Sequence, residues 1–293
     1  MKRILSTYLF VKRKLTPALV TEIARSGVQS VELFCARSHF DYRNEDTVRE
    51  LAGALADHNL PVHAVHAPAE RDFNTTRDSS VPLSICDPDR SRRLEAVDEV
   101  KRTLDMAEYV SFPFLVQHLG SSRDSADPRL FEAAFNSLEH LRIFAKQRGV
   151  TIALENTRGE LATSANLRQF LAETRLGGVS LCFDIGHAHL GEGVEKSLEE
   201  MRDLVVTAHI HDNHGVKDEH LAPYETESSD SEPADDTIDW KAAFAIMPAV
   251  PLVLELKEQP AWAEPSPASV SLDIARQSFD RVEEALAAEH PTA

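Results

Sequence analysis

Short apolar segments alternate along the whole chain with longer segments in which apolar residues recur at helical spacing. The short segments are rich in valine, leucine and isoleucine, which is typical of strands that are buried on both faces. They predict eight strands, at residues 4–10, 28–34, 61–66, 112–118, 150–155, 179–184, 205–211 and 251–255.

The segments between them carry the apolar stripe of an amphipathic helix, with apolar residues three or four positions apart. One such segment begins at Thr16, whose hydroxyl suits a helix N-cap, with Pro17 in the first turn. The predicted helices cover residues 16–26, 44–57, 89–109, 130–147, 164–174, 194–202, 239–246 and 269–289.

Eight strand–helix units in succession predict an α/β chain that folds as a single-domain (β/α)8 TIM barrel over residues 1–293. An open, doubly wound sheet is the alternative. Its nucleotide-binding form has no support, since no Gly-x-Gly-x-x-Gly follows the first strand and no Walker loop occurs in the sequence. The longest irregular segment, residues 213–237, is acidic and polar over 225–236, so we expect a solvated loop whose role the sequence leaves open.

The composition is globular and strongly acidic. The chain has 48 Asp and Glu against 31 Lys and Arg, which gives a formal net charge of −17. Such a chain repels a phosphate backbone, which disfavours a nucleic-acid partner. The three cysteines form no C-x-x-C pair, and three basic residues at 12–14 cut the apolar N-terminus too short for a signal peptide. We therefore expect a reduced, cytoplasmic protein with no membrane segment, as a monomer or a homo-oligomer.

Each of the last six predicted strands ends in or near a side chain that can bind a metal or transfer a proton. Side chains at the carboxyl ends of barrel strands converge on one mouth, where the chemistry of such barrels takes place. Two short segments extend the set: His187 follows the sixth strand, and Asp218 and His220 form an Asp-x-His pair beyond the seventh. The strand-end residues are His66, His118, Glu155, Asp184, His209 and Glu255.

The charge of this set calls for a cation. Glu155, Asp184, Asp218 and Glu255 would bring four negative charges into one mouth, which is costly unless they are neutralised. One divalent ion leaves two negative charges, which suits a neutral sugar, whereas three ions give two positive charges, which suits a phosphodiester. Oxygen and imidazole donors without thiolate fit zinc, manganese or cobalt, so we expect one to three such ions per chain and no organic cofactor.

Other chemically active side chains have a structural explanation. His63 and His140 are expected at ordinary core or surface positions, because an isolated imidazole is often half-buried. Cys182 lies within a predicted strand and is expected in the core rather than as a nucleophile. Asp239 is expected to cap the helix that begins at Trp240.

Five motifs resemble those of the xylose-isomerase-like barrel superfamily, in the order in which that superfamily has them. This superfamily contains sugar phosphate isomerases and epimerases, and it also contains endonuclease IV-type repair enzymes. The resemblance spans almost the whole chain and is specific for the superfamily, but not for the reaction. The motifs are Val65-His66-Ala67-Pro68, Gln117-His118-Leu119-Gly120, Ala153-Leu154-Glu155-Asn156-Thr157, Cys182-Phe183-Asp184-Ile185-Gly186-His187 and His209-Ile210-His211-Asp212-Asn213.

Resemblance to the epimerase branch implies one metal ion, held by Glu155, Asp184, His209 and Glu255. It also implies that the two glutamates serve as acid and base on opposite faces of the substrate, while His187 orients a substrate hydroxyl. The expected reaction is isomerisation or epimerisation of a small sugar, sugar phosphate or polyol ketone, by proton abstraction through an enediolate.

Resemblance to the endonuclease IV branch implies three zinc ions and the hydrolysis of a phosphodiester, as in an AP endonuclease. All nine ligand positions of that branch are filled here by the matching residue type. His66, His118 and Glu155 would hold one ion, and His187, Asp218 and His220 a second; Asp184, His209 and Glu255 would hold the third, with Glu155 bridging.

The sequence departs from these relatives in two places. Tyr224-Glu225-Thr226-Glu227 stands where isomerase-like members have Gly-Glu-Gly, and Ala69 stands where the repair enzymes have a tyrosine that helps to probe DNA. The acidity of the chain and Ala69 favour the isomerase or epimerase hypothesis over the phosphodiesterase. A metal-binding or ligand-sensing barrel without catalysis is the third alternative.

Overall fold

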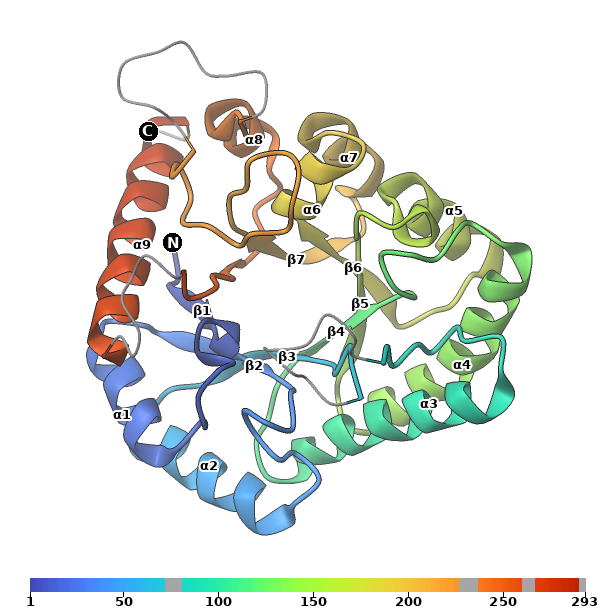
Figure 1. The fold of residues 1–293 in the computed structure, drawn as a ribbon, viewed down its shortest axis with the longest axis horizontal. Coiled ribbons are helices and arrows are strands. Elements are labelled where there is room, and N and C mark those ends of the chain that lie inside the picture. The colour runs from blue at the N-terminus through green and yellow to red at the C-terminus, as the bar shows by residue number, and fades with distance from the viewer. Residues whose placement is uncertain (72–80, 227–236, 260–266, 290–293) are drawn as a thin grey trace.

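Eight parallel strands pair in chain order and close into a barrel, with the first strand also paired to the last (Figure 1). The structure is a computed structural model, and it describes residues 1–71, 81–226, 237–259 and 267–289. Closure confirms the predicted (β/α)8 barrel and rules out the open, doubly wound sheet. The strands are β1 Ile4–Ser6, β2 Ser30–Phe34, β3 Val62–His66, β4 Phe114–His118, β5 Thr151–Glu155, β6 Val179–Asp184, β7 Val205–Ile210 and β8 Leu252–Leu254.

Helices surround the barrel on the outside (Figure 1). Thr16 accepts a hydrogen bond from the amide of Leu19, and Asp239 accepts one from Ala242, so both predicted N-caps are confirmed. The α-helices are α1 Pro17–Arg25, α2 Glu45–Asp57, α3 Arg90–Asp105, α4 Pro128–Gln147, α5 Ser164–Thr174, α6 Ile185–Leu190, α7 Val194–Met201, α8 Trp240–Ile246 and α9 Ala268–Glu289. Three 3-10 helices join them: η1 Thr7–Phe10, η2 Met106–Glu108 and η3 Glu160–Ala162.

Two predicted boundaries were wrong in an informative way. The first strand stops at Ser6 instead of residue 10, because the Ser6 hydroxyl accepts the amide of Tyr8 and starts the 3-10 turn η1. Helix α6 was not predicted, because its six residues are too short for a helical period. It begins directly after β6, where the carboxylate of Asp184 caps it by accepting the amide of His187 at 2.6 Å.

The hydrophobic core has an outer and an inner part. The outer part packs the apolar helix faces against the barrel, whereas Ala64, Val116, Ala153 and Cys182 form a separate small cluster. These four alternate along their strands with residues of the outer core, so they face the barrel interior. The core position predicted for Cys182 is confirmed, since its side chain is fully buried.

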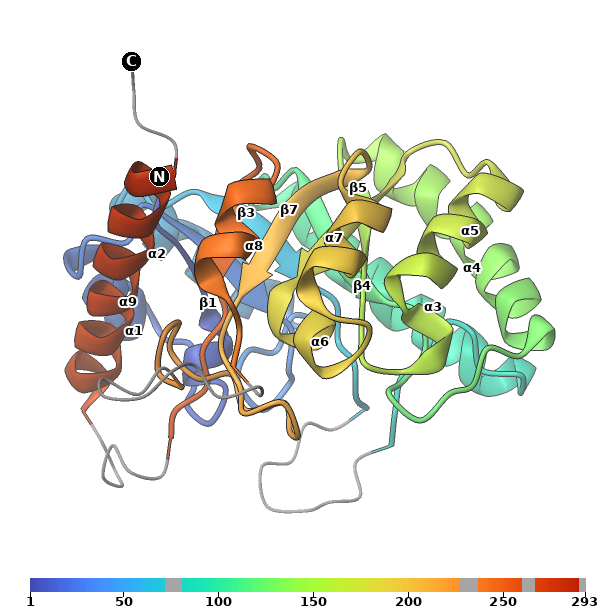
Figure 2. The same ribbon diagram turned by 90° about the horizontal axis from the view of Figure 1, so that it is seen from above.

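The loops that follow the strands lie at one end of the barrel (Figure 2). The predicted acidic loop is irregular only in part. Asp212 and Leu221 exchange two backbone hydrogen bonds of 2.9 Å, and the Asp212 carboxylate accepts the amide and hydroxyl of Thr226. The first part of the segment is therefore tied to β7, while residues 227–236, most of the acidic stretch, lie outside the described residues.

Across the helices that the structure describes, we find none with the length and apolar content required to span a lipid bilayer.

Candidate functional site

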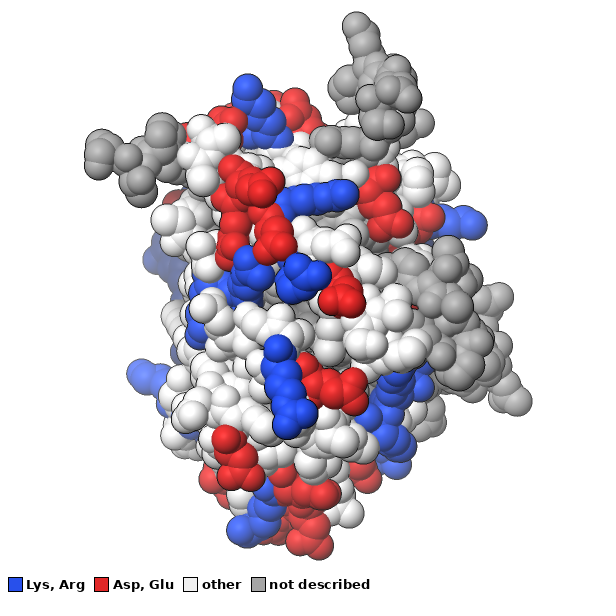
Figure 3. Space-filling model, turned by 90° about the vertical axis from the view of Figure 1, so that its left-hand side faces the viewer, with Lys and Arg blue, Asp and Glu red and all other residues white. Residues whose placement is uncertain are grey.

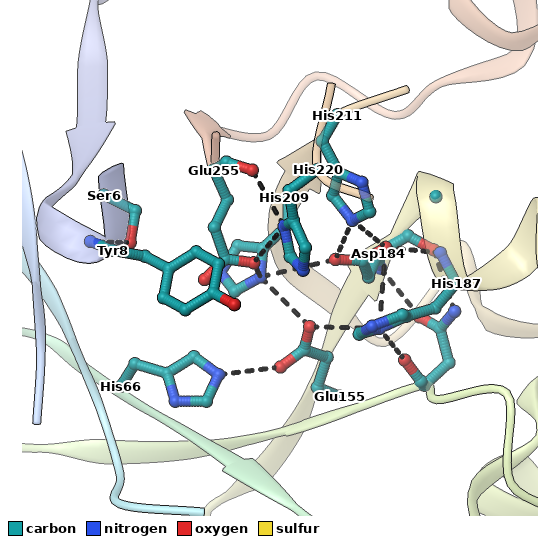
Figure 4. A network of polar contacts seen from close by, with 12 residues as sticks. Ser6, Tyr8, His66, Glu155, Asp184, His187, His209, His211, His220 and Glu255 are labelled. Carbon is teal, nitrogen blue, oxygen red and sulfur yellow. Dashed lines mark hydrogen bonds and ion pairs between the residues drawn. The ribbon is translucent and has the colours of Figure 1, made fainter. Parts of the chain in front are cut away.

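All nine side chains proposed from the sequence meet at the carboxyl end of the barrel. Figure 4 shows those of them other than His118 and Asp218. The positions follow from strand direction, because parallel strands bring their last residues to one rim. Three groups of potential metal-binding side chains form there, and within each group the candidate ligand atoms lie within 4.8 Å of one another. The groups are Glu155, Asp184, His209 and Glu255; His66, His118 and Glu155; and His187, His211, Asp218 and His220.

The first group is arranged around the Nδ1 atom of His209. This nitrogen lies 3.1 Å from a carboxylate oxygen of Glu155, 3.3 Å from one of Glu255 and 3.7 Å from one of Asp184. Glu155, Asp184 and His209 are completely buried, and Glu255 is nearly so. Three carboxylates therefore converge on one point that bulk water does not reach.

The other nitrogen of His209 is held by a carboxylate that the sequence analysis did not identify. His209 Nε2–H donates to Glu32 Oε2 at 3.0 Å, and Ser6 Oγ donates to Glu32 Oε1 at 3.0 Å. Glu32 is completely buried on β2. This contact makes Nε2 the protonated nitrogen and turns Nδ1 towards the cluster, as an outer carboxylate does for a metal-binding histidine.

The second group joins β3, β4 and β5. His66 Nε2 and His118 Nε2 lie 3.1 and 3.0 Å from the same oxygen of Glu155, while the other Glu155 oxygen faces His209. His66 Nδ1–H donates to the carbonyl of Ala67, which fixes Nε2 as the nitrogen that faces Glu155. Glu155 is therefore shared between the first two groups.

The third group depends on the loop after β7. Asp218 lies between two imidazoles, with His187 Nε2 at 3.1 Å and His220 Nε2 at 3.3 Å from its two oxygens. The remaining nitrogens of these rings donate to backbone carbonyls, His187 Nδ1 to Asn156 and His220 Nδ1 to Glu255. Both Nε2 atoms are therefore directed at the same carboxylate.

His211 completes this third group and was not proposed as a ligand from the sequence. It stacks on His220 with a ring-centroid distance of 3.9 Å, and its Nε2–H donates to Asp184 at 3.1 Å. Its Nδ1 is buried and has no hydrogen-bond partner among the described residues. The sequence did contain a signal for His211. Alternate residues of a strand point to the same face, so His211 is expected on the same face as His209.

One signal in the sequence could have revealed Glu32. It is a lone carboxylate in the apolar segment Val31-Glu32-Leu33-Phe34, and burial of an unpaired carboxylate in such a strand is costly. Its partners, however, lie on β1 and β7, so the pairing with Ser6 and His209 depends on barrel closure.

The two histidines that were expected at ordinary core or surface positions lie outside the three groups. His63 is buried against Thr207, with 2.9 Å between His63 Nε2 and Thr207 Oγ1, and His140 is exposed.

The carboxylates and imidazoles of the mouth stabilise each other's charged forms. Burial alone would raise the pKa of Glu155, but the imidazoles of His209 and His118 outweigh it and hold that pKa well below its usual value. Burial likewise opposes charge on His66, yet the Glu155 carboxylate raises the pKa of His66 to about 9. Without a metal, protons on the histidines neutralise the carboxylates; a divalent ion can take over that role.

The donor set fits a divalent metal. It consists of carboxylate oxygens and imidazole nitrogens without thiolate, and a backbone carbonyl or a carboxylate fixes the orientation of four of the rings. These second partners are what metal-binding histidines in proteins normally have. Zinc, manganese and cobalt all suit such ligands.

A cavity of about 300 Å³ opens above the three groups. Its floor contains Glu155, His187, Asp218 and Glu255, and its wall includes Tyr8, Phe34 and Ala69. Tyr8 packs against His220, with ring centroids 4.9 Å apart. The volume is at the small end of the range for ligand pockets, so it suits a small molecule.

The sequence is similar to those of several known proteins. An uncharacterized protein of Sinorhizobium fredii, y4fM, is 28% identical over 207 residues, which are 64% of this chain and 62% of that protein. A probable endonuclease 4 of Haloquadratum walsbyi is 26% identical over 132 residues, 45% of this chain and 40% of that protein. The chain thus matches less than two thirds of the length of each of these two relatives.

Solved structures share the fold over nearly the whole length. A D-tagatose 3-epimerase-like protein superposes with a TM-score of 0.70 at 20% identity, and the match covers 97% of this chain and 99% of that one. The IolI protein with a bound zinc atom superposes with a TM-score of 0.74 at 16% identity over all of both chains. The model of one family, the xylose isomerase-like TIM barrel, matches residues 20–276. The chain therefore belongs to the xylose isomerase-like TIM barrel family.

Proposed function

We propose that the protein is a divalent-metal-dependent isomerase or epimerase of a small sugar or sugar phosphate. The observation that carries the proposal is the convergence of Glu155, Asp184 and Glu255 on the Nδ1 atom of His209, beneath a cavity of small-molecule size. The sugar epimerase among the proteins of similar fold supports the same class of substrate.

Glu155, Asp184, His209 and Glu255 would hold the metal ion. When bound, such an ion polarises a carbonyl and its neighbouring hydroxyl and stabilises the enediolate form of the substrate. Glu155 and Glu255 both line the cavity, so each has an oxygen within reach of a bound ketose. One would remove the proton next to the carbonyl and the other would return it, while His187 would orient a substrate hydroxyl.

The charge of the protein supports a small substrate over nucleic acid. The chain carries a formal net charge of −17. On the face that Figure 3 shows, acidic and basic side chains of the described residues are interspersed, with no continuous basic surface. A phosphate backbone needs such a surface, because phosphate contacts supply most of the non-specific affinity.

Proton exchange with solvent tests the proposal. Metal-loaded protein in deuterium oxide should exchange the proton next to the carbonyl in at least one member of a panel of ketoses and ketose phosphates, as followed by NMR. Glu255→Gln should reduce this exchange by about 10²-fold or more, because general acid–base catalysis typically contributes 10²–10⁴-fold. Glu70→Gln is the matched control, since Glu70 lines the same cavity but belongs to none of the three groups. Exchange by the Glu255→Gln variant at the wild-type rate would contradict the acid–base assignment.

A second candidate function is a zinc phosphodiesterase of the endonuclease IV type. The observation that favours it is the presence of all three groups of ligands, including the two that an epimerase does not need. Elemental analysis of reconstituted protein distinguishes the two: about one ion per chain supports the epimerase, and about three support the phosphodiesterase. If the protein nicked DNA at abasic sites and exchanged no solvent deuterium into any sugar, the phosphodiesterase would be the better supported function.

A further inference from the structure

Two exposed arginines line the cavity that has the acidic floor. Arg123 lies in the loop after β4 and Arg158 in the loop after β5, and both line the same cavity as Glu155 and Glu255. Among the described residues, neither guanidinium has an ion-pair or hydrogen-bond partner. Arg129, by contrast, pairs with Asp127 at 2.6 Å.

The two loops are locked together by close backbone contact. A Cβ atom at Gly159 would lie 2.7 Å from the carbonyl oxygen of Ser121 and 3.0 Å from the Cα atom of Ser122. Only glycine allows this approach, which sets Arg158 beside the segment that carries Arg123. The proximity of the two loops that carry the arginines is therefore a consequence of backbone packing.

The first loop is also fixed internally. Asp124 Oδ2 accepts the amide of Ser121 at 2.7 Å and its hydroxyl at 3.0 Å, and the Asp124 carbonyl accepts the amide of Leu161 from the neighbouring loop. The carboxylate nearest in sequence to Arg123 is thus engaged with Ser121. The guanidinium of Arg123 stays available at the mouth of the cavity.

The cavity is lined by charges of both signs. Its lining includes four carboxylates and the imidazoles, and it also includes the two exposed guanidinium groups with Ser121 and Ser122; the carboxylates are those of Glu70, Glu155, Asp218 and Glu255. Guanidinium groups bind phosphate oxygens through two parallel hydrogen bonds, which lysine cannot reproduce.

We infer that Arg123 and Arg158 form a subsite for the phosphate group of the substrate, so that the protein acts on a phosphorylated sugar in preference to a neutral one. The inference rests on the proposed function and narrows it. The hydroxyl and carbonyl end of the molecule occupies the acidic floor, and the phosphate ester lies at the arginine edge together with Ser121 and Ser122.

Calorimetry with a matched pair of probes tests the subsite without requiring turnover. Manganese-loaded wild-type protein should bind D-ribulose 5-phosphate at least tenfold more tightly than D-ribulose. The double variant Arg123→Gln, Arg158→Gln should lose about tenfold to hundredfold in affinity for the phosphate ester, and much less for the neutral sugar, because two charge-assisted contacts disappear. The double lysine variant should recover only part of the loss.

Arg129→Ala is the matched control, because Arg129 is exposed nearby, is already paired and does not line the cavity. Equal wild-type affinity for the two probes, no binding of the phosphate ester, or an equal loss for both probes in the glutamine double variant would overturn the inference. So would arginine-dependent binding of abasic DNA without binding of the phosphate ester. Deuterium exchange reports separately on the proposed function. If binding depended on the phosphate group but no proton exchanged, the proposed isomerase or epimerase reaction would be refuted, whereas the phosphate subsite would stand.

Discussion

At the scale of single residues, one buried carboxylate controls how the central histidine faces its partners. Glu32 accepts a hydrogen bond from His209 Nε2–H, and Ser6 holds the other oxygen of Glu32. A histidine has two nitrogens, and only the deprotonated one can bind a metal. Glu32 is therefore a positioning residue that acts through His209.

Glu32→Gln should weaken binding of a divalent metal by about 10- to 100-fold, the usual effect of losing the outer partner of a metal-binding histidine. The measurement is competition with a chelator of known affinity. Glu99→Gln is the control: Glu99 is also buried and hydrogen-bonded, to Tyr42 and Arg43, but these contacts lie outside the three ligand groups. If Glu99→Gln weakened metal binding as much as Glu32→Gln, the effect would be a general loss of stability.

A second residue links the stability of the fold to pH. His39 lies in the loop after β2, is almost completely buried, and donates from Nδ1 to the carbonyl of Arg13 at 2.6 Å. Burial lowers its pKa from 6.5 to about 4, although hydrogen bonds to backbone carbonyls oppose the shift. The folded state keeps this imidazole neutral, while the unfolded state protonates it below pH 6.5. Its contribution to stability is therefore intact above pH 6.5 and falls as the pH drops towards 4.

The penalty between pH 6.5 and pH 4 is about 3 kcal/mol, since one pKa unit corresponds to about 1.4 kcal/mol. His39→Gln cannot be protonated, so it should destabilise the protein less at pH 4.5 than at pH 7. Urea unfolding of both proteins at several pH values measures the difference. A constant difference across that pH range would show that His39 does not titrate on unfolding.

At the scale of elements, the short helix α6 packs closely against the segment that follows β7, and Gly186 of α6 lies at the contact. A Cβ atom at Gly186 would lie 2.0 Å from Cε1 of His211. His211 cannot move aside freely, because it stacks on His220 and donates to Asp184. The absence of a side chain at Gly186 therefore lets α6 approach the ligand groups.

Gly186→Ala should lower the free energy of unfolding by about 1–3 kcal/mol, the usual cost of overpacking a core, despite the better helix propensity of alanine. It should also weaken metal binding, because His211 is displaced. Gly53→Ala is the matched control. Gly53 lies in α2, and a Cβ atom there meets nothing within 4 Å, so this change should stabilise the protein by about 0.5–1 kcal/mol. If Gly186→Ala left the free energy of unfolding unchanged, the imidazole of His211 would have a second conformation that avoids the added methyl group.

At the scale of the whole molecule, four carboxylates are gathered where they are hardest to solvate. Glu32, Glu155, Asp184 and Glu255 are all less than 4% exposed, within one region of an acidic chain. We therefore expect metal binding at this region to be linked to folding, because the unfolded chain cannot gather the same ligands.

At a concentration about 1,000 times its dissociation constant, a bound ligand stabilises the folded state by about 4 kcal/mol. Zinc, manganese or cobalt at that concentration should therefore raise the midpoint of thermal unfolding by about 10 °C. Addition of a chelator should reverse the shift. Glu155→Ala removes the carboxylate shared by two groups and should abolish most of it. Equal midpoints with and without every one of these metals would contradict the assignment of a metal site.

The sequence by itself determined the barrel and the approximate set of side chains at its mouth. Strand and helix periods are local, and eight strand–helix units leave the closed barrel as the natural way to bury strands that are apolar on both faces. Because strand direction alone sends His66, Glu155 and Glu255 to one rim, the position of these residues followed without knowledge of any contact.

Only the tertiary structure decided which of these side chains touch and which further residues join them. The pairing of Glu32 with His209 depends on closure between strands far apart in sequence, since 177 positions separate the two residues. The position of His211 depends on Gly186, where a Cβ atom would meet the imidazole ring. The position of Arg158 beside the Ser121 loop depends on Gly159, where a Cβ atom would meet the backbone of that loop. Such contacts arise from register and packing, which no local period encodes.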